Sequence, residues 1–222
     1  MRFSRVLMVL VVVAGLGAGA AVADVIKLDF NNSASGPTQE GWLGVYPNNR
    51  LDDGTAVDCG GGVLAGATAW ATMSSRDRQT QTADNPDLLR DFMEITSYAG
   101  NHDDVGFELT GLQPGDYYVT VISGDANYWA SGDRVDVNGV IAELPDWPND
   151  PTTATLAGLS LTVTVTVGGD GVLALRRVLR EGGGAYWFGK LAGLKVEPVP
   201  EPAAVALLVM GAGALLARRR RR

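Results

Sequence analysis

Two aromatic residues, Tyr128 and Trp129, stand side by side in a segment rich in polar side chains. Trp147 stands between two prolines in a second such segment, residues 145–150. Sugar rings stack their C–H faces on exposed aromatic rings, and nearby carboxylates, amides and guanidinium groups hydrogen-bond the sugar hydroxyls. The two segments therefore predict a carbohydrate-binding surface. The polar residues expected to assist the rings are Asp125, Asn127, Asp133 and Arg134.

The same aromatic rings have a purely structural alternative. Large rings in connecting segments also pack over the ends of β-sandwiches, and in that case they bind nothing. This alternative stays open for Trp129 and for Trp147. Trp42, Trp70 and Trp187 have apolar neighbours in the sequence, and we expect them in the core.

Acidic residues are the candidate metal ligands. Calcium binds carboxylate and carbonyl oxygens, which the pairs Asp52–Asp53 and Asp103–Asp104, together with Asp29, are able to supply. The sequence contains no twelve-residue calcium-binding loop pattern, so a solvated acidic surface is the alternative. A structural calcium ion stays open, and we expect no other cofactor.

The residues available for catalysis are few. His102 is the only histidine, which excludes zinc sites built from two or three histidines. Cys59 is the only cysteine, which excludes an intramolecular disulfide, and we expect it to be an inert small side chain. The sequence has no Gly-x-Ser-x-Gly motif, phosphate loop or dinucleotide-binding motif. We therefore expect no enzyme, with a weak polysaccharide esterase or hydrolase as an alternative.

Short alternating segments between Gly, Asn, Asp and Pro clusters predict an all-β fold. Asn138 and Gly139 predict a hairpin between strands 134–138 and 140–144. The glycines at 168–171 are expected to turn strand 159–167 back into strand 172–178, and residues 87–93 are either a helical turn or a strand. Eight to ten strands without strand–helix alternation predict an antiparallel sandwich of jelly-roll type. The remaining expected strands are 25–30, 42–46, 105–109, 117–122 and 187–196.

A series of short motifs along residues 24–197 resembles the galactose-binding-like β-sandwich domain found beside rhamnogalacturonan acetylesterase-type and agarase catalytic domains. The resemblance implies a jelly roll and a role on polysaccharide. Asn31 and Asn32 depart from that family, which tends to have a glycine after the first strand. The motifs are Leu28–Phe30, Gly41–Trp42, Ser75–Arg78, Leu89–Phe92, Phe107 with Leu109, Leu112–Tyr117, Val119–Val121, Gly124–Asp125 and Val135–Gly139.

The last residues, 198–222, combine three features in a fixed order. A Pro-Glu-Pro motif at 200–202 precedes an apolar run at 203–217, and five arginines follow. Fifteen residues of helix would span about 22 Å, which is short of the roughly 30 Å hydrocarbon core. This order resembles the PEP-CTERM sorting signal of bacteria, which implies recognition and cleavage by an exosortase-type membrane enzyme. Pro200, Glu201 and Pro202 carry that match, and a buried terminal helix is the alternative for the apolar run.

The other end of the chain predicts export. Residues 1–23 have two arginines, an apolar stretch from Val6 to about Leu16, and Ala21-Val-Ala23 as a cleavage site, which is typical of a Sec signal peptide. A retained N-terminal anchor is the alternative. The region between the two ends, residues 24–200, holds 11 Lys and Arg against 24 Asp and Glu, a formal charge of −13. This charge argues against nucleic acid as a partner.

Together these features predict an exported protein that is held transiently in the membrane through residues 203–217. It then reaches the cell surface or the extracellular polysaccharide and binds carbohydrate there without catalysis. The main alternative is a structural surface or biofilm protein without a ligand.

Overall fold

Alternation of apolar and polar residues folds this chain into short strands, with a buried face and a solvent-exposed face on each sheet. The computed structural model describes residues 25–68, 72–77, 87–88, 91–96, 106–123, 134–143, 159–177 and 189–200. The unit Asp24–Pro198 contains all of the strands that these residues form. They are β1 Ile26–Phe30, β2 Leu43–Val45, β3 Val57–Asp58, β4 Leu64–Ala67, β5 Thr72–Asp77, β6 Asp91–Thr96, β7 Gly106–Thr110, β8 Gly115–Ser123, β9 Arg134–Val137, β10 Val140–Glu143, β11 Ser160–Val167, β12 Leu173–Arg177 and β13 Gly189–Pro198.

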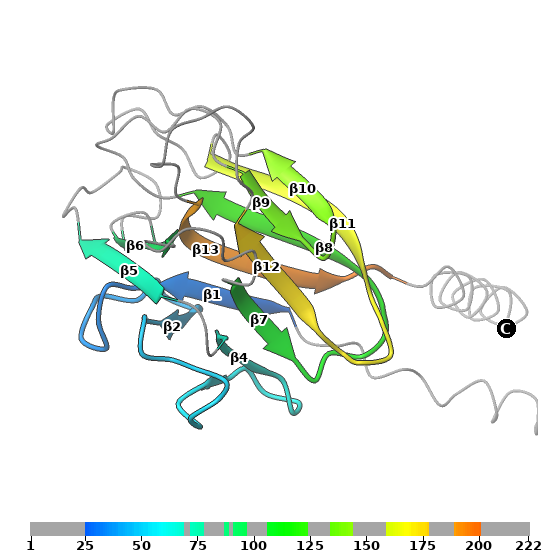
Figure 1. Cartoon of the computed structure of the whole chain (residues 1–222), viewed down its shortest axis with the longest axis horizontal. Helices are drawn as coiled ribbons and strands as arrows, with labels where there is room; N and C mark the ends of the chain where they lie inside the picture. The colour runs from blue at the N-terminus through cyan, green and yellow to red at the C-terminus, as the bar shows by residue number, and fades with distance from the viewer. Residues whose placement is uncertain are drawn as a thin grey trace, which may run out of the picture. The chain divides into compact units, whose positions relative to one another are not determined.

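The first sheet is built around β13 and β8 (Figure 1). Its main path runs β11-β8-β13-β1-β2, and the antiparallel pair β5–β6 joins through β6, which pairs with the first residues of β13. β13 therefore has two neighbours on one edge, β6 near its start and β1 near its end. The β1–β2 pair is parallel, which corrects the prediction of a wholly antiparallel sandwich.

The second sheet has the order β10-β9-β12-β7-β4-β3, and every pairing within it is antiparallel. The β9–β10 hairpin turns at Asn138 and Gly139, both with positive φ (48° and 84°), which confirms the predicted Asn-Gly turn. Strand β3 was not predicted, because two paired residues leave almost no alternation to detect.

A hydrophobic core lies between the two sheets. The inward side chains of β1, β8, β11 and β13 face those of β4, β7, β9 and β12, and most of them are fully buried. Phe30 of β1 and Phe107 of β7 meet edge to face across the sheets, with ring centroids 5.0 Å apart. A smaller cluster of Leu88, Ile122, Leu159 and Ala192 has Trp42 half-buried against it, which agrees in part with the expectation that Trp42 is a core residue.

Short turns connect the two sheets at one end of the sandwich, which we call the turn end. Residues 111–114 join β7 to β8, and residues 168–172 join β11 to β12. The predicted reversal at 168–171 is confirmed, but the two strands that it joins lie in different sheets, because β11 pairs with β8 in one sheet and β12 pairs with β7 and β9 in the other. Turn-forming glycines predict where a chain reverses, but they do not determine which sheet the next strand joins.

Three residues hold the turn end together. The Tyr117 hydroxyl donates a 2.8 Å hydrogen bond to the carbonyl of Gln113, four residues earlier, as in a tyrosine corner. Gly171 approaches this turn so closely that a Cβ would lie 2.7 Å from the carbonyl oxygen of Leu112. Asn138 accepts from the backbone nitrogen of Ala174 at 2.7 Å, and its amide nitrogen donates to the carbonyl oxygens of Val172 and Thr166 at 3.1 and 3.3 Å.

The remaining predicted strands agree with the structure within a few residues. The ambiguous segment 87–93 is a turn at 87–88 followed by the start of β6, so its strand alternative is confirmed. Two packed sheets without strand–helix alternation confirm the all-β sandwich.

Candidate functional site

The predicted carbohydrate-binding residues lie largely outside the described part of the chain. Arg134 is the first residue of β9, where its backbone is described and its side chain is not. Pro200 of the sorting motif is exposed, and Glu201 and Pro202 lie outside the described residues, as do His102 and the pair Asp103–Asp104. The other predicted binding residues outside the described part are Asp125, Asn127, Tyr128, Trp129, Asp133 and Trp147.

The strand ends that flank the two aromatic segments are described, and in the first sheet they are neighbours. Segment 124–133 follows Ser123 at the end of β8, and segment 144–158 precedes Leu159 and the start of β11. Ser160 of β11 pairs with Ile122 of β8. One segment therefore begins beside the point where the other finishes.

The same arrangement occurs in the second sheet. Segment 124–133 finishes at Arg134 of β9, and segment 144–158 begins after Glu143 of β10. Arg134 and Glu143 are a cross-strand pair. The two aromatic segments are therefore attached side by side at both of their ends.

These strand ends lie at the end of the sandwich opposite the turn end, and we call it the long-connection end. It also holds the start of β7 at Gly106, the end of β12 at Arg177 and the start of β13 at Gly189, where Gly106 pairs with Arg176 and Arg177 pairs with Val135. Figure 1 shows these strand ends on the side away from the end of β13. The segments attached there are 69–71, 97–105, 124–133, 144–158 and 178–188.

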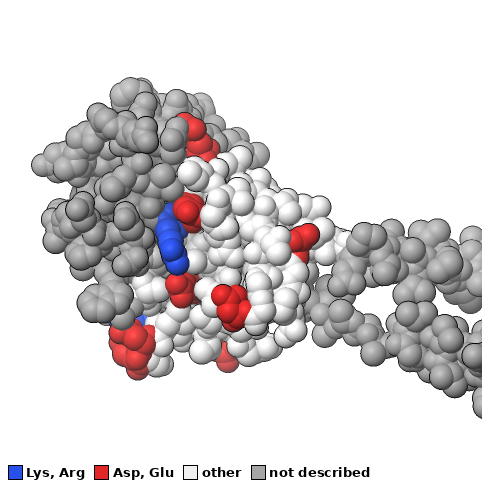
Figure 2. All heavy atoms as spheres, turned by 45° about the vertical axis from the view of Figure 1, so that its right-hand side comes forward, with Lys and Arg blue, Asp and Glu red and all other residues white. Residues whose placement is uncertain are grey.

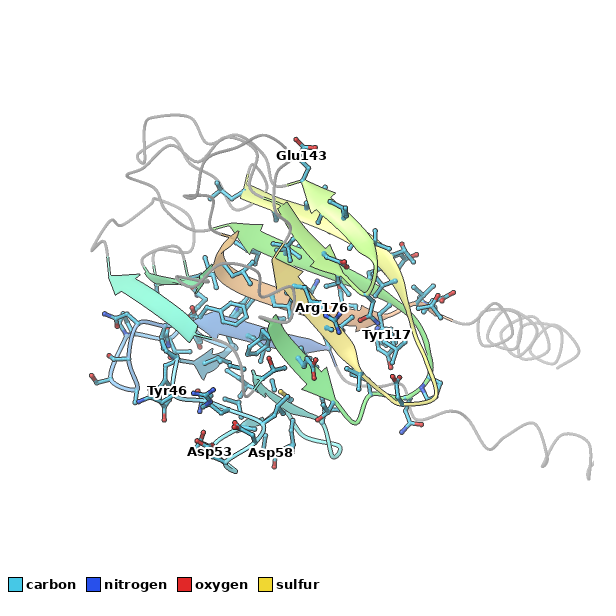
Figure 3. All side chains as sticks on the ribbon, viewed as in Figure 1. Tyr46, Asp53, Asp58, Tyr117, Glu143 and Arg176 are labelled. Carbon is cyan, nitrogen blue, oxygen red and sulfur yellow. The ribbon has the colours of Figure 1, made fainter. Side chains whose placement is uncertain are left out.

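Both termini of the sandwich leave from the turn end. Ile26 at the start of β1 pairs with Val196 near the end of β13, and Pro198 pairs with Tyr117 near the start of β8. Figure 3 shows Tyr117 toward this end and Glu143 toward the long-connection end. The antiparallel registers thus place the chain's entry and exit at one end and its long connections at the other.

On the outer face of the second sheet, residues that the structure describes form a polar surface next to the long-connection end. Arg176 of β12 is exposed, and its cross-strand partners are Asp136 of β9 and Gly106 of β7. A Cβ on Gly106 would lie 2.6 Å from the carbonyl oxygen of Leu175, and it would be in ordinary contact with Cγ of Arg176 at 3.5 Å. Figure 3 shows Arg176 projecting from β12.

This face carries both positive and negative charges, and they lie on different strands. Asp136 and the half-buried Glu108 flank the arginine position on neighbouring strands. In Figure 2 basic atoms lie between two groups of acidic atoms, with broad uncharged surface to their right. Within the described part of the chain, Arg176 forms no hydrogen bond or ion pair. Donors beside carboxylate acceptors suit neighbouring sugar hydroxyls.

This polar face was not predicted from the sequence. The alternation within residues 173–177 indicates that Ala174 and Arg176 share a face, but it does not show that the face is open. The cross-strand neighbour of Arg176 is Gly106, which belongs to a strand distant in sequence.

The buried carboxylate of Asp29, a candidate calcium ligand, is satisfied by hydrogen-bond donors. Its Oδ2 accepts from the backbone nitrogen of Gln39 at 2.6 Å. Asn31, oriented to satisfy its neighbours, donates to Asp29 Oδ1 at 3.2 Å and accepts from the Thr38 hydroxyl at 2.7 Å. The cluster therefore fixes the chain after β1 to the segment that leads into β2.

Asp53, a second calcium candidate, organises its own loop. Thr55 donates to Asp53 Oδ1 from both its backbone nitrogen and its hydroxyl, and the hydroxyl bond in particular holds the pKa of this carboxyl below its usual value. Within the described residues, no group of three or more His, Cys, Asp or Glu side chains is arranged to hold a metal ion.

Cys59 is half-buried beside β3, and its thiol points to the carbonyl of Val57 at 3.7 Å. Burial raises the pKa of the Cys59 thiol to about 11, and the charge of Asp58 adds to the effect. Because the thiolate is the nucleophile, a thiol that stays protonated at neutral pH is unreactive. This agrees with the expectation of an inert cysteine.

The predicted membrane segment, residues 203–217, lies outside the described residues. In the described part of the chain, no helix has the length and apolar character needed to span a bilayer.

No protein-family model matches this chain, and no curated protein matches it. Three solved structures share parts of its fold. Protein YXIM of Bacillus subtilis is 21% identical with a TM-score of 0.49, over 79% of this chain and 40% of that one. A family 35 carbohydrate-binding module from Clostridium thermocellum is 15% identical with a TM-score of 0.29, over 58% of this chain and 92% of that one. An adhesin domain of Lys-gingipain is 12% identical with a TM-score of 0.25, over 59% of this chain and 82% of that one.

This chain thus spans two fifths of the length of the Bacillus protein that it matches. The described residues themselves establish the architecture, which is an all-β sandwich of two sheets.

Proposed function

We propose that this protein is an exported carbohydrate-binding β-sandwich whose long-connection end binds the glycan. One observation carries the proposal. The two tryptophans predicted to stack on sugars, Trp129 and Trp147, belong to segments attached at the long-connection end, whereas both termini leave from the turn end.

The chemistry of sugar recognition supports this end as the binding surface. Trp129 and Trp147 belong to the two segments whose flanking strand ends are paired, so their polypeptide anchors are neighbours. Tyr128, Asp125 and Asn127 accompany Trp129 in one segment, and Arg134 ends it. We propose that the rings stack on sugar faces while these polar groups, with Arg176 from the outer sheet face, hydrogen-bond the hydroxyls.

The positions of the termini support display on a surface. We propose that residues 198–222 are the tether, and they continue from the end of β13 at the turn end of the sandwich. We propose that the signal peptide delivers the chain through the Sec pathway, and that residues 203–217 hold it in the membrane until an exosortase-type enzyme acts at Pro200–Pro202. We also propose that the sandwich is a jelly roll of the galactose-binding-like type.

The binding proposal is tested with the full chain in a non-glycosidic detergent, so that the detergent offers no competing sugar. Retention on a panel of plant, algal and bacterial polysaccharides is compared for wild type, Trp129→Ala and Tyr118→Ala. Tyr118 is an aromatic residue exposed on the outer face of the first sheet, away from the long-connection end, and it serves as the matched control. Loss of a stacking ring should weaken binding at least tenfold, about 1.4 kcal/mol or more.

Two outcomes would overturn this proposal. If no polysaccharide retards the wild-type chain, the protein is a structural surface component whose aromatic residues pack against its own sandwich. If Trp129→Ala lowers the unfolding temperature but leaves retention unchanged, the long-connection end is not the binding surface.

The processing proposal has its own test. Intact-mass measurement of the extracellular protein should find a chain that lacks Arg218–Arg222. Mature extracellular protein that retains these arginines would overturn the cleavage step and leave the binding proposal unaffected.

A further inference from the structure

Strand β11 forms one edge of the first sheet. It pairs with β8 through eight consecutive residue pairs, from Ser160 with Ile122 to Val167 with Gly115, without a register shift. Figure 1 shows β11 as a long strand along the side of the sandwich. The other edge of a strand at the border of a sheet presents backbone N–H and C=O groups to a further strand.

Strand β11 itself lacks three features that commonly prevent strand pairing. Natural proteins protect exposed edges with charged residues, proline or a bulge. Residues 152–169 contain no charged residue and no proline, although the body of the chain is strongly acidic, and the register of β11 shows no bulge. Alternating Thr and Val over this length is a sequence of high β-propensity and no charge, which favours pairing with another strand.

The neighbouring surface is also apolar. Val140 and Ile141 of β10 are 38% and 55% exposed, and β10 lies beside β11 at the same side of the sandwich (Figure 1). Val163 of β11 is half-buried against the core. The side-chain amide of Asn138 donates a 3.3 Å hydrogen bond to the carbonyl oxygen of Thr166, near one end of the strand.

We propose that β11 pairs antiparallel with β11 of a second copy of this chain, which joins two first sheets across a two-fold axis. The alternation is self-complementary. With Thr164 opposite itself, Thr162 faces Thr166 and Val163 faces Val165, so hydroxyls meet hydroxyls on the outer face and apolar groups meet on the core side. A symmetric pair uses the same patch on both copies.

The absence of charge on β11 favours an uncharged partner strand, and β11 of a second copy is such a strand. Two bodies of formal charge −13 repel each other wherever their acidic surfaces meet, and a charged partner strand would find no counter-charge on β11. The uncharged strand is the part of this acidic chain where close approach of two copies costs least in electrostatic energy. The proposal is independent of what the long-connection end binds.

The test places charges on the proposed two-fold axis. Sedimentation velocity of the full chain in density-matched detergent should show a dimer for wild type and a monomer for Thr164→Lys and for Thr164→Glu, with the dissociation constant raised at least tenfold. Thr164 is exposed, so neither substitution buries a charge. Gln113→Lys adds the same charge at an exposed turn away from the edge and should leave the dimer intact.

A mixture of the two Thr164 variants provides the decisive measurement. Lysine opposite glutamate should restore a dimer that contains one copy of each variant. A monomeric wild-type chain overturns the proposal, as does a dimer that persists in both single variants, because that dimer would be formed by another surface such as the C-terminal segment. Failure of the mixture to dimerise would exclude pairing centred at Thr164 and overturn the proposed geometry.

Discussion

The side chain of Asn138 is predicted to be a main support of the turn end. It lies in the β9–β10 turn, accepts from the backbone nitrogen of Ala174 at 2.7 Å and donates to the carbonyl oxygen of Val172 at 3.1 Å. Its third bond, to the carbonyl oxygen of Thr166, crosses to β11 in the other sheet and is exposed. Replacing Asn138 with glycine removes these three bonds and keeps the positive φ of 48° accessible.

The expected destabilisation follows from the burial of these bonds. The two partly buried bonds contribute about 1 kcal/mol each, and the exposed one contributes less. Loss of this side chain, which links the turn to β11 and β12, should therefore cost about 2–3 kcal/mol in the free energy of unfolding. Asn138→Ala adds the strain of a left-handed alanine, about 1 kcal/mol more.

Equilibrium guanidinium unfolding followed by far-UV circular dichroism measures these changes, provided that the dependence on denaturant concentration is unchanged. Gly139→Ala is the matched control. Gly139 has a φ of 84° with open space where a methyl group would stand, so its substitution reports backbone strain alone. If Asn138→Gly costs no more than Gly139→Ala, the hydrogen bonds of Asn138 do not support the turn end and our account of it is wrong.

Three further predictions concern single residues. Tyr117→Phe removes the hydrogen bond to the Gln113 carbonyl and should lower the free energy of unfolding by about 1 kcal/mol in the same assay. An unchanged free energy would show that this hydrogen bond does not stabilise the turn end. Gly171→Ala forces a methyl group against the carbonyl oxygen of Leu112 at positive φ and should cost more than about 2 kcal/mol; a cost below that of Gly139→Ala would contradict the close approach. Because burial raises the pKa of the Cys59 thiol from 9.0 to about 11, the folded chain should react with iodoacetamide at pH 8 about a hundredfold more slowly than the unfolded chain. For the same reason, the free energy of unfolding should fall as the pH rises from 9 toward 11. Equal labelling rates for the folded and unfolded chains would contradict the burial of Cys59.

The local parts of the fold were predictable because neighbouring residues determine them. Asn138 and Gly139 are both suited to positive φ, so the hairpin between β9 and β10 could be predicted from two residues. The alternation of Thr and Val in β11 predicted a strand with one exposed face, and Thr162, Thr164 and Thr166 are exposed. Strand type and hairpin turns follow from such short-range patterns.

Pairing between distant strands was not predictable from these patterns. The glycines at 168–171 predicted a reversal, but Gly171 instead packs against Leu112, and the chain crosses to the other sheet. The parallel pairing of β1 with β2 depends on Asp29 and Asn31, whose hydrogen bonds fix the chain between them. These contacts join residues of different segments, so the pattern within one segment does not predict them.

The candidate site also has a part that the sequence predicted and a part that it did not predict. Composition alone identified the aromatic segments around Trp129 and Trp147, because stacking rings with polar neighbours are recognisable in sequence. Their attachment at one end of the sandwich depends on the pairing of β8 with β11 and of β9 with β10. The neighbours of the exposed Arg176, Gly106 and Asp136, belong to two other strands.

Footprinting of the glycan-bound protein tests the central claim most directly. The full chain is exposed to hydroxyl radicals with and without the polysaccharide that retains it best, and the oxidation of each segment is compared. Our account predicts protection of segments 124–133 and 144–158 at the long-connection end, and unchanged oxidation of the turns at 111–114 and 168–171 at the turn end. Protection of the turn end, or no protection of either aromatic segment by a polysaccharide that binds, would contradict it.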